Sequence, residues 1–520
     1  MTFKSKNTTG PVVIVCKDVS FAFPFGIAYL AGYLRQKGED VRVLFRPDNP
    51  GYYKSFIQEI IALKPLIVGF GSLYPDLYAV VKLTKILDEE GRSFPVVIGG
   101  QMVSPTPEFA VKVTGADYGV IGEGEIILYE LVTALRERRD PSDVKGLVIR
   151  DGEEIQSTGL GAFINDLSQL PPIPYDLFPS EKWLNIGKFY ARYAQPHWHY
   201  DDRVISIHGG RGCPYRCNFC YHHSKARYRS ISDMMAEADE LLVRYNANVL
   251  YFGDDLVLSS PKRARELTES LKKLSRPVEY SVSCRFDILS RIDDELLREM
   301  RETGCRIMGL GIESGSQRIL DIMNKNITVE QILSGLRRLK DVGILPTVSI
   351  MVGQVSETLE DVGKSKSLMI ETVRYDKRIQ YAFTITTPFP GSDLYNTAFK
   401  KGILKNHFDF YKRFSPATQM TGLSVNLSDM SDADVIKMRN ELELIFIREI
   451  TKLRGKGVMK VEATRNFLAH QESFFFEIFF MRLPKSLRLI MVKPYGWLFD
   501  LAQTFLDKLR LKMLGISKVH

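Results

Sequence analysis

The sequence predicts an α/β protein built from two parallel-sheet domains and a helical region. At 520 residues the chain is too long for one ordinary domain, and its 45% hydrophobic content is enough for buried cores, which excludes a disordered chain. Short aliphatic runs alternate with helical periodicity, which implies parallel strands joined by right-handed crossovers. We expect a doubly wound, Rossmann-like sheet over residues 1–150, a linker over 151–200, a partial (βα)6 barrel over 201–400 and a helical domain over 401–520.

Five aliphatic runs bounded by Gly, Pro or Asp predict the strands of the first sheet. They are Val12–Cys16, Val41–Phe45, Leu66–Phe70, Val96–Gly99 and Tyr118–Ile121, and the helical patterns between or after them are Gly26–Lys37, Tyr52–Leu63, Asp76–Glu90, Thr106–Val113 and Glu125–Glu137. Ligands of such sheets lie beyond the carboxyl ends of the strands. The loops there contain Gly, Ser or Pro, which fits a resting surface for a large flat ligand or ordinary turns. These loops are Lys17–Phe25, Gly71–Pro75, Gly99–Pro107 and Gly122–Glu125.

A proline-rich stretch from Leu167 to Pro196 indicates a stiff linker. Alternation then resumes with six predicted strands, at Val204–His208, Val249–Phe252, Tyr280–Cys284, Ile307–Ile312, Thr347–Val352 and Gln380–Ile385. Ser230 with Asp233 and Thr328 with Gln331 are candidate helix caps. Six units without the last two of a full barrel predict an open barrel whose chemistry gathers at the carboxyl ends of its strands.

The net charge of +8 belongs to the end of the chain. Residues 451–520 contain 13 Lys and Arg and 5 Asp and Glu, so the rest is neutral, which removes any general case for a nucleic-acid partner. The aromatic, basic tail from Leu483 to Leu514 predicts either an interfacial helix on an anionic membrane or a helical cap on the barrel.

No run of about 18 uncharged apolar residues occurs, and Met1–Gly10 lacks an apolar signal core. We therefore expect a cytoplasmic protein, which contacts the inner membrane face if the tail is the interfacial helix.

Three of the six cysteines fall within eight positions, at Cys213, Cys217 and Cys220. This pattern indicates a metal site in a reducing compartment, not a disulfide framework. Thiolates so close together favour an iron–sulfur cluster or zinc, for which His222 or His223 could supply a fourth ligand. The other three, Cys16, Cys284 and Cys305, are expected in the core, with an extra ligand or radical-quenching role open to Cys284.

The Cys-x3-Cys-x2-Cys spacing after the first barrel strand resembles the cluster motif of the radical S-adenosylmethionine (radical SAM) superfamily. The resemblance implies that Cys213, Cys217 and Cys220 are the catalytic metal ligands of a [4Fe–4S] cluster whose fourth iron binds SAM. Reductive cleavage of SAM then yields a 5′-deoxyadenosyl radical, and the cofactor carries the hard chemistry. Phe219 matches the aromatic position near the SAM adenine.

Polar residues at the next strand ends match the SAM contacts of the same superfamily. The resemblance implies contacts to the SAM ammonium, carboxylate and ribose, and the candidate residues are Asp254, Asp255, Ser283, Arg285, Glu313 and Ser314. The segment Val352–Thr358 departs from the expected Gly-x-Pro-Gly-Glu-Thr form, because it lacks the Pro and the second Gly.

The first domain is similar to the cobalamin-binding domain of B12-dependent radical SAM enzymes, through Phe23–Leu30, Val97–Gln101 and Gly122–Glu125. No His occurs between Met1 and Gln195, so no imidazole from this domain can ligate cobalt. A degenerate domain that has lost cobalamin is the alternative. The candidate corrinoid contacts are Gly71, Ser72, Gly99, Gly100, Gly122 and Glu123.

The resemblance implies a cobalamin-dependent radical SAM methyltransferase that methylates an unactivated carbon through a 5′-deoxyadenosyl radical and methylcobalamin. The first alternative is a non-methylating enzyme like the anaerobic magnesium-protoporphyrin monomethyl ester cyclases, and the second is an Fe–S or corrinoid-binding regulatory protein. A methylthiotransferase is disfavoured, because only Cys16 precedes the cluster motif. The implied partners are a low-potential electron donor of flavodoxin or ferredoxin type and a small-molecule substrate, which the tail suggests is apolar or membrane-associated.

Overall fold

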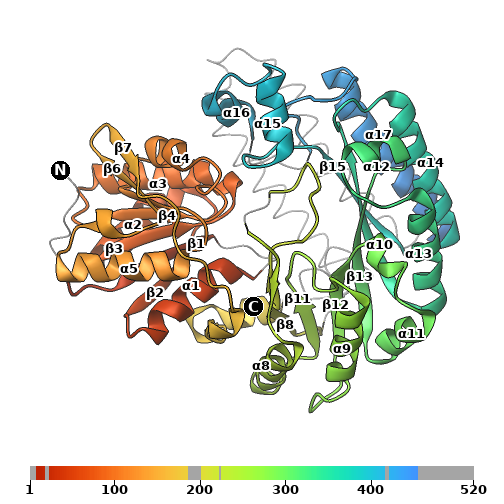
Figure 1. Cartoon of the computed structure of the whole chain (residues 1–520), viewed down its shortest axis with the longest axis horizontal. Coiled ribbons are helices and arrows are strands. Elements are labelled where there is room, and N and C mark those ends of the chain that lie inside the picture. Colours follow the sequence, from red (N-terminus) through yellow and green to blue (C-terminus); the bar gives the residue numbers. More distant parts are fainter. Residues whose placement is uncertain are drawn as a thin grey trace, which may run out of the picture. The chain divides into compact units, whose positions relative to one another are not determined.

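The computed structural model describes residues 8–17, 23–185, 199, 201–221, 224–415 and 421–454 (Figure 1). The chain divides into two compact units, Met1–Arg454 and Gly455–His520, and every described residue belongs to the first. The predicted tail at Leu483–Leu514 therefore lies outside the described residues. None of the described helices is both long enough and apolar enough to span a membrane.

The N-terminal sheet has the strand order β2-β1-β3-β4-β5-β6-β7. Its strands are β1 (Val12–Lys17), β2 (Val41–Arg46), β3 (Ile67–Gly71), β4 (Val96–Gly99), β5 (Tyr118–Val120), β6 (Leu147–Asp151) and β7 (Glu154–Ser157). The first five are parallel and match the predicted strands to within one residue, whereas β6 and β7 form an antiparallel extension that the periodicity did not predict. The sheet thus continues past residue 150.

Five helices accompany this sheet, and they also agree with the sequence prediction to within one residue. They are α1 (Phe25–Gln36), α2 (Tyr53–Ala62), α3 (Leu77–Glu89), α4 (Pro107–Thr114) and α5 (Gly124–Glu137). Helix α1 contacts α5, while α3 contacts both α2 and α4, which gives the two helical layers of a doubly wound sheet. Strand β1 is buried from Val12 to Cys16, as expected for a strand covered on both faces.

The second sheet has the order β15-β14-β13-β12-β11-β8, and all its strands are parallel. They are β8 (Val204–Ile207), β11 (Val249–Phe252), β12 (Glu279–Cys284), β13 (Cys305–Glu313), β14 (Leu345–Val352) and β15 (Gln380–Ile385). All six predicted strands are confirmed to within two residues. Among the described strands β8 and β15 do not pair with each other, so the barrel is open, as predicted.

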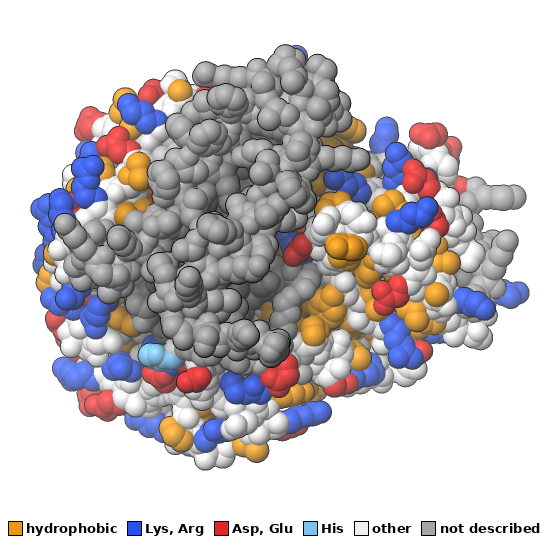
Figure 2. All heavy atoms as spheres, turned by 180° about the vertical axis from the view of Figure 1, so that it is seen from behind, with side chains coloured by type: hydrophobic (Ala, Val, Ile, Leu, Met, Phe, Trp, Pro, Cys, Tyr) orange, Lys and Arg blue, Asp and Glu red, His pale blue; other side chains and the backbone are white. Residues whose placement is uncertain are grey.

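The connecting helices are α8 (Ile231–Arg244), α9 (Pro261–Leu271), α10 (Phe286–Leu289), α11 (Asp294–Glu302), α12 (Gln317–Ile322), α13 (Val329–Val342) and α14 (Leu359–Tyr375). Both predicted caps are confirmed. The Ser230 hydroxyl accepts a hydrogen bond from the Asp233 amide, and Thr328 and Gln331 form a capping box at the start of α13. On the face seen in Figure 2, positive and negative side chains are intermixed over the described surface.

The described part of the predicted linker is packed against both sheets. Ile173 donates its amide to Glu237 of α8, and the buried Tyr175 hydroxyl donates to the carbonyl of Ser206 in β8 at 2.5 Å. A Cβ at Gly32 of α1 would lie 3.2 Å from the ring of Pro171, so this glycine allows the linker to approach α1 closely. The short helix α6 (Ser180–Leu184) lies near the end of the part of the linker that the structure describes.

The region after the barrel completes the hydrophobic core of the N-terminal domain. It contains α15 (Asp393–Lys400), α16 (His407–Arg413) and α17 (Asp432–Arg454). Phe410 of α16 contacts Tyr74, and the rings of Tyr78 and Tyr411 stack 4.5 Å apart. Helix α17 instead packs on α14 and β15. The described part of the predicted helical region therefore packs on both domains, with α16 in the core of the N-terminal domain and α17 on the barrel.

Truncation of Phe410 tests the packing of α16 on the N-terminal domain. Phe410 is fully buried, so Phe410→Ala should cost about 3 to 5 kcal/mol of stability, seen as a lower melting temperature. The matched control is Phe408→Ala on the same helix, where the ring is 42% exposed and the loss should be clearly smaller. Equal losses in the two variants would contradict the packing described above.

Candidate active site

The three cysteines lie on a loop whose two ends are joined by a short antiparallel ribbon. The ribbon consists of β9 (Gly210–Arg211) and β10 (Arg227–Tyr228). The loop begins at Gly212, which has a φ of +75° and where a Cβ would lie 3.0 Å from the Ser224 carbonyl oxygen. Glycine is therefore needed for the first turn of the loop.

Asn218 ties the middle of the loop to the barrel and to α15. Its amide donates to the carbonyl of Met323 at 3.0 Å, and its side-chain nitrogen donates to the carbonyl of Ile322 at 2.9 Å. Its own carbonyl accepts from Leu394 at the start of α15. The cysteine loop is thus held at two places, at its neck, which is the β9–β10 ribbon, and at its centre, which is Asn218.

The surroundings of Cys217 favour its thiolate form. Cys217 is buried, whereas Cys213 and Cys220 are partly exposed. A hydrogen bond from Cys220, with Lys325 and Arg285 nearby, lowers the pKa of Cys217, while burial raises the pKa of Cys213. The Arg285 guanidinium donates to the Cys217 sulfur at 3.6 Å. Thiolates are the form that binds metal.

The loop fits an iron–sulfur cluster by the type of its donors, because it carries three cysteines that form no disulfide and one of them lies among cations that favour its thiolate. Within the described residues no three His, Cys, Asp or Glu side chains are grouped closely enough to hold one metal ion. His222 and His223, the candidate fourth ligands for zinc, lie outside the described residues. In a [4Fe–4S] cluster each thiolate binds a different iron, so the cysteines need not converge on one point. Cys16, Cys284 and Cys305 are buried, as predicted for core residues.

Arg285 is part of a buried network beside the cysteine loop. Its guanidinium lies 3.6 Å from the ring centre of Tyr215, donates to Asp287 at 2.9 Å and also donates to the carbonyl of Lys325. The Tyr215 hydroxyl donates to the other Asp287 oxygen at 2.5 Å. The residue predicted to meet the SAM carboxylate therefore already forms hydrogen bonds with Cys217, Asp287 and Lys325.

Lys325 is a site residue that the sequence analysis missed. Its ammonium group donates to Glu313 at 2.8 Å and lies 5.6 Å from the ring centre of Phe219. Ser349 of β14 donates to the second Glu313 oxygen at 2.8 Å. Lys325 comes from the loop after α12, 12 residues beyond Glu313, so no strand-end pattern pointed to it. Lys325 therefore links Glu313, at the end of β13, to Phe219 in the cysteine loop.

The remaining predicted SAM contacts divide into two groups. Asp254 is buried and accepts from the Gly209 amide at 3.0 Å, and burial raises its pKa to about 7. The Ser283 hydroxyl donates to the Asp254 carbonyl at 3.4 Å, whereas Asp255 is exposed. Ser314 is fully buried and its hydroxyl meets Ser365 of α14 at 3.3 Å. Asp254 and Ser283 thus form one group, because they contact each other. Asp255 and Ser314 lie apart from that group, since Asp255 is exposed and Ser314 contacts α14.

The turn after β14 is held by hydrogen bonds, although its sequence departs from the Gly-x-Pro-Gly-Glu-Thr form. The Glu357 carboxylate accepts from the amides of Gly353 at 2.6 Å and Gln354 at 3.2 Å. Gly353 has a φ of +92°, and Thr358 with Asp361 forms a capping box that starts α14. Glu357 therefore holds the turn without the missing Pro and second Gly.

The loops after β3, β4 and β5 meet at the carboxyl edge of the N-terminal sheet. The Ser72 amide donates to Gly99 at 3.5 Å, and the Gly122 amide donates to the Ser104 hydroxyl at 2.9 Å. Gly100 has a φ of +82°, and a Cβ there would lie 2.8 Å from the Ser72 carbonyl oxygen. These small residues, with the partly exposed Gly71, form an edge that suits a flat ligand such as a corrinoid.

A buried carboxylate that the sequence analysis did not single out supports this edge. Asp76 pairs with Arg46 at the end of β2 at 2.9 Å and with Lys17 at the end of β1 at 3.3 Å, and it accepts from the Ser72 hydroxyl. Glu123, predicted to contact the corrinoid, is also buried, and its carboxylate pairs with arginines of the barrel.

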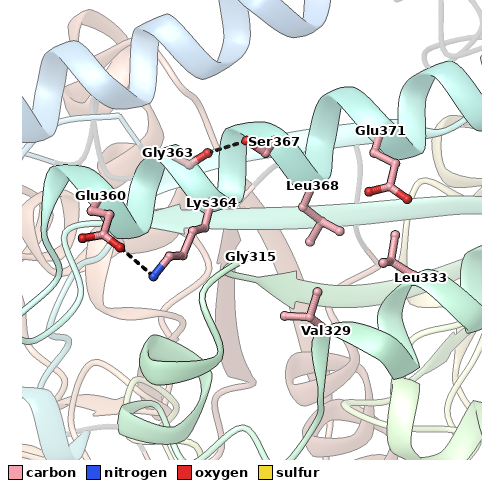
Figure 3. A pocket seen from close by; sticks show the side chains of 9 residues that line it. All are labelled: Gly315, Val329, Leu333, Glu360, Gly363, Lys364, Ser367, Leu368 and Glu371. Carbon is pink, nitrogen blue, oxygen red and sulfur yellow. Dashed lines mark hydrogen bonds and ion pairs between the residues drawn. The ribbon is translucent and has the colours of Figure 1, made fainter.

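A separate groove of ≈ 520 Å³ lies between α13 and α14 (Figure 3). Val329 and Leu333 face Leu368 across it, and Glu360 pairs with Lys364 at its rim at 2.9 Å. The groove contains none of the predicted site residues.

Two family models match the chain, one for each sheet. The B12 binding domain matches residues 11–132, and the Radical SAM superfamily matches residues 207–369. The second match contains the cysteine loop and the barrel strands β11 to β14. The protein is therefore a radical SAM enzyme, and the alternative of a regulatory protein is not retained. More particularly, the chain combines a radical SAM domain with a B12-binding domain, and the cofactors of these two domains are a [4Fe–4S] cluster, SAM and cobalamin.

The chain is similar to two curated relatives, and it shares its fold with one solved structure. An uncharacterized methyltransferase of Pyrococcus horikoshii is 28% identical over 76% of this chain and 80% of its own length. The anaerobic magnesium-protoporphyrin IX monomethyl ester cyclase of Rubrivivax gelatinosus is 29% identical over 75% of this chain and 68% of its own length. The structure of TsrM from Kitasatospora setae, a radical SAM methyltransferase with cobalamin and a [4Fe–4S] cluster bound, has the same fold. Its TM-score is 0.61, at 21% identity over 75% of this chain and 78% of TsrM.

Replacement of one loop cysteine should reduce cluster loading. We expect Cys217→Ala to bind clearly less iron per chain after anaerobic reconstitution and to lose visible charge-transfer absorbance, because each thiolate binds one iron. Cys305→Ala, which changes a buried core cysteine, is the control and should keep its iron. Wild-type iron content in Cys217→Ala would contradict the assignment of the loop.

The stability of the turn after β14 should depend on pH. Burial raises the pKa of Glu357 from 4.5 to about 7. Because the folded-state pKa is the higher one, the contribution of Glu357 is complete below pH 4.5 and is lost as pH rises through about 7, by roughly 3 kcal/mol.

The test compares wild type with Glu357→Gln, a neutral variant that keeps an acceptor oxygen for the two turn amides. Melting temperatures should be similar near about pH 5, and wild type should become less stable than the variant by about pH 8. The exposed Glu360→Gln is the control and should show no such divergence. A constant difference between wild type and Glu357→Gln across this range would refute the assignment.

Proposed function

We propose that the protein is a cobalamin-dependent radical SAM methyltransferase that methylates an unactivated carbon of a small-molecule substrate. The observation that carries the proposal is the contact between the cysteine loop and a histidine-free B12-binding domain. Arg211 and Arg227, at the neck of that loop, pair with Glu123 and Glu125 of the N-terminal domain. The relative of Pyrococcus horikoshii that carries the name methyltransferase supports it further.

The chain offers residues for each part of the chemistry. When bound, the cluster and SAM supply a 5′-deoxyadenosyl radical, and cobalamin serves as the methyl carrier. Cys213, Cys217 and Cys220 would hold the cluster, and the buried Asp254 carboxylate would offer a charge-assisted hydrogen bond to the SAM ammonium. The small residues at the edge formed by Ser72 and Gly100 would support the corrinoid.

A second candidate is a radical cyclase that transfers no methyl group. The 29% identity with the anaerobic magnesium-protoporphyrin IX monomethyl ester cyclase of Rubrivivax gelatinosus favours it. Both candidates need a low-potential one-electron donor, which we propose to be of flavodoxin or ferredoxin type. The proposal of an apolar or membrane-associated substrate depends on the sequence of the tail from Leu483 to Leu514 alone.

Product analysis distinguishes the two candidates. After anaerobic reconstitution with iron, sulfide and hydroxocobalamin, reduction in the presence of SAM should yield both 5′-deoxyadenosine and S-adenosylhomocysteine. The second product should require bound corrinoid, and Cys217→Ala should form no 5′-deoxyadenosine. Formation of 5′-deoxyadenosine without S-adenosylhomocysteine would reject methyl transfer and favour the cyclase-like reaction.

A further inference from the structure

Two arginines face each other at the neck of the cysteine loop. Arg211 in β9 is the register partner of Arg227 in β10, and all three loop cysteines lie between them in the chain. Directly opposite residues of an antiparallel pair project to the same side, and like charges in that position repel each other. The closed neck therefore needs negative partners on that side.

Those partners come from the N-terminal domain. Glu123 pairs with both arginines, with its Oε2 atom 3.3 Å from Nη1 of Arg211 and 3.1 Å from Nη1 of Arg227. Glu125 pairs with Arg211, with 2.5 Å between Oε1 and Nη2. Glu123 and Arg227 share a second contact through Oε1 and Nη2. Two carboxylates thus neutralise two guanidinium groups across the domain boundary.

The four side chains are buried. Their exposed fractions are 7% for Glu123, 4% for Glu125, 10% for Arg211 and 13% for Arg227. Burial opposes ionisation of Glu123, but the two arginines outweigh it and its pKa is lowered. Each buried charge depends on its partners, because removal of one leaves another unpaired away from water.

The local sequence directs both carboxylates to the barrel. Gly122 has a φ of +86°, which lets the chain turn sharply before α5. Glu123 occupies the cap position of α5, yet its side chain forms no capping hydrogen bond. Arg227 also donates to the carbonyl of Ile164 at 2.5 Å, so the segment before the barrel joins the same contact.

We propose that Glu123 and Glu125 form an interdomain clamp that holds the neck of the cysteine loop and thereby positions the cluster relative to the B12-binding domain. The two carboxylates are positioning residues. Glu123, which was predicted to contact the corrinoid, instead pairs with Arg211 and Arg227. The clamp rests on the cysteine loop carrying the cluster, and it is independent of whether a methyl group is transferred. Failure of methyl transfer would appear in the wild-type products and would leave the spectra below unchanged.

The test compares reconstituted wild type with Glu123→Gln, Arg227→Gln and the double variant. The measurement is the EPR spectrum of the reduced cluster with and without SAM, at matched iron content. A clamp predicts the same change in all three variants, namely a broadened spectrum and a fraction of SAM-responsive cluster that falls at least about twofold.

A through-space charge effect predicts a different pattern. Loss of a carboxylate and loss of a guanidinium would then change the SAM-responsive fraction of the cluster in opposite directions, and the two changes would cancel in the double variant, which would overturn the proposal. Unchanged spectra in all three variants would overturn it as well. Glu371→Gln, which removes a carboxylate from the exposed pair with Arg337, is the matched control and should resemble wild type. If Glu123→Gln does not fold, Glu123→Asp keeps the charge, shortens the reach and should show the same broadening.

Discussion

Charge neutrality in the buried contact between the two domains is the constraint on which the site depends. The neck of the cysteine loop carries two opposed arginines, and Glu123 and Glu125 of the other domain neutralise them. The B12-binding sheet and the loop that binds the cluster are therefore one electrostatic unit. In the proposed reaction a radical generated from SAM would have to reach a substrate near the corrinoid, so a fixed distance between the two sites would be of direct use.

The hydrophobic core reinforces the same arrangement through a segment that follows the barrel. Helix α16 places Phe410 against Tyr74, so the chain leaves the barrel and returns to the N-terminal sheet. Asn218 joins this return segment to the cysteine loop through the amide of Leu394. The loop is thus supported by charge at its neck and by a packed segment at its centre, and each support comes from a different part of the chain.

Buried cations beside the cysteines give the site its electrostatic character. Arg285 donates to Cys217, and Lys325 pairs with Glu313 while lying over Phe219. Both cations favour thiolate over thiol, which is the form an iron–sulfur cluster requires. Two of the residues expected at the strand ends, Arg285 and Glu313, therefore contact the cysteine loop or its neighbour Lys325. Asp254, which follows β11, is buried and accepts a hydrogen bond from the Gly209 amide.

The sequence by itself determined the features that depend on neighbours in the chain. Strands, helices and the caps at Ser230 and Thr328 follow from local periodicity and hydrogen bonding, and the cysteine spacing indicates the cluster loop. The tertiary structure alone decided the partners of Glu123 and Lys325 and the burial of Arg285. Glu123 and Arg227 lie 104 residues apart, and no local pattern encodes which distant charge will neutralise a buried one. That choice is made only when both are removed from water together.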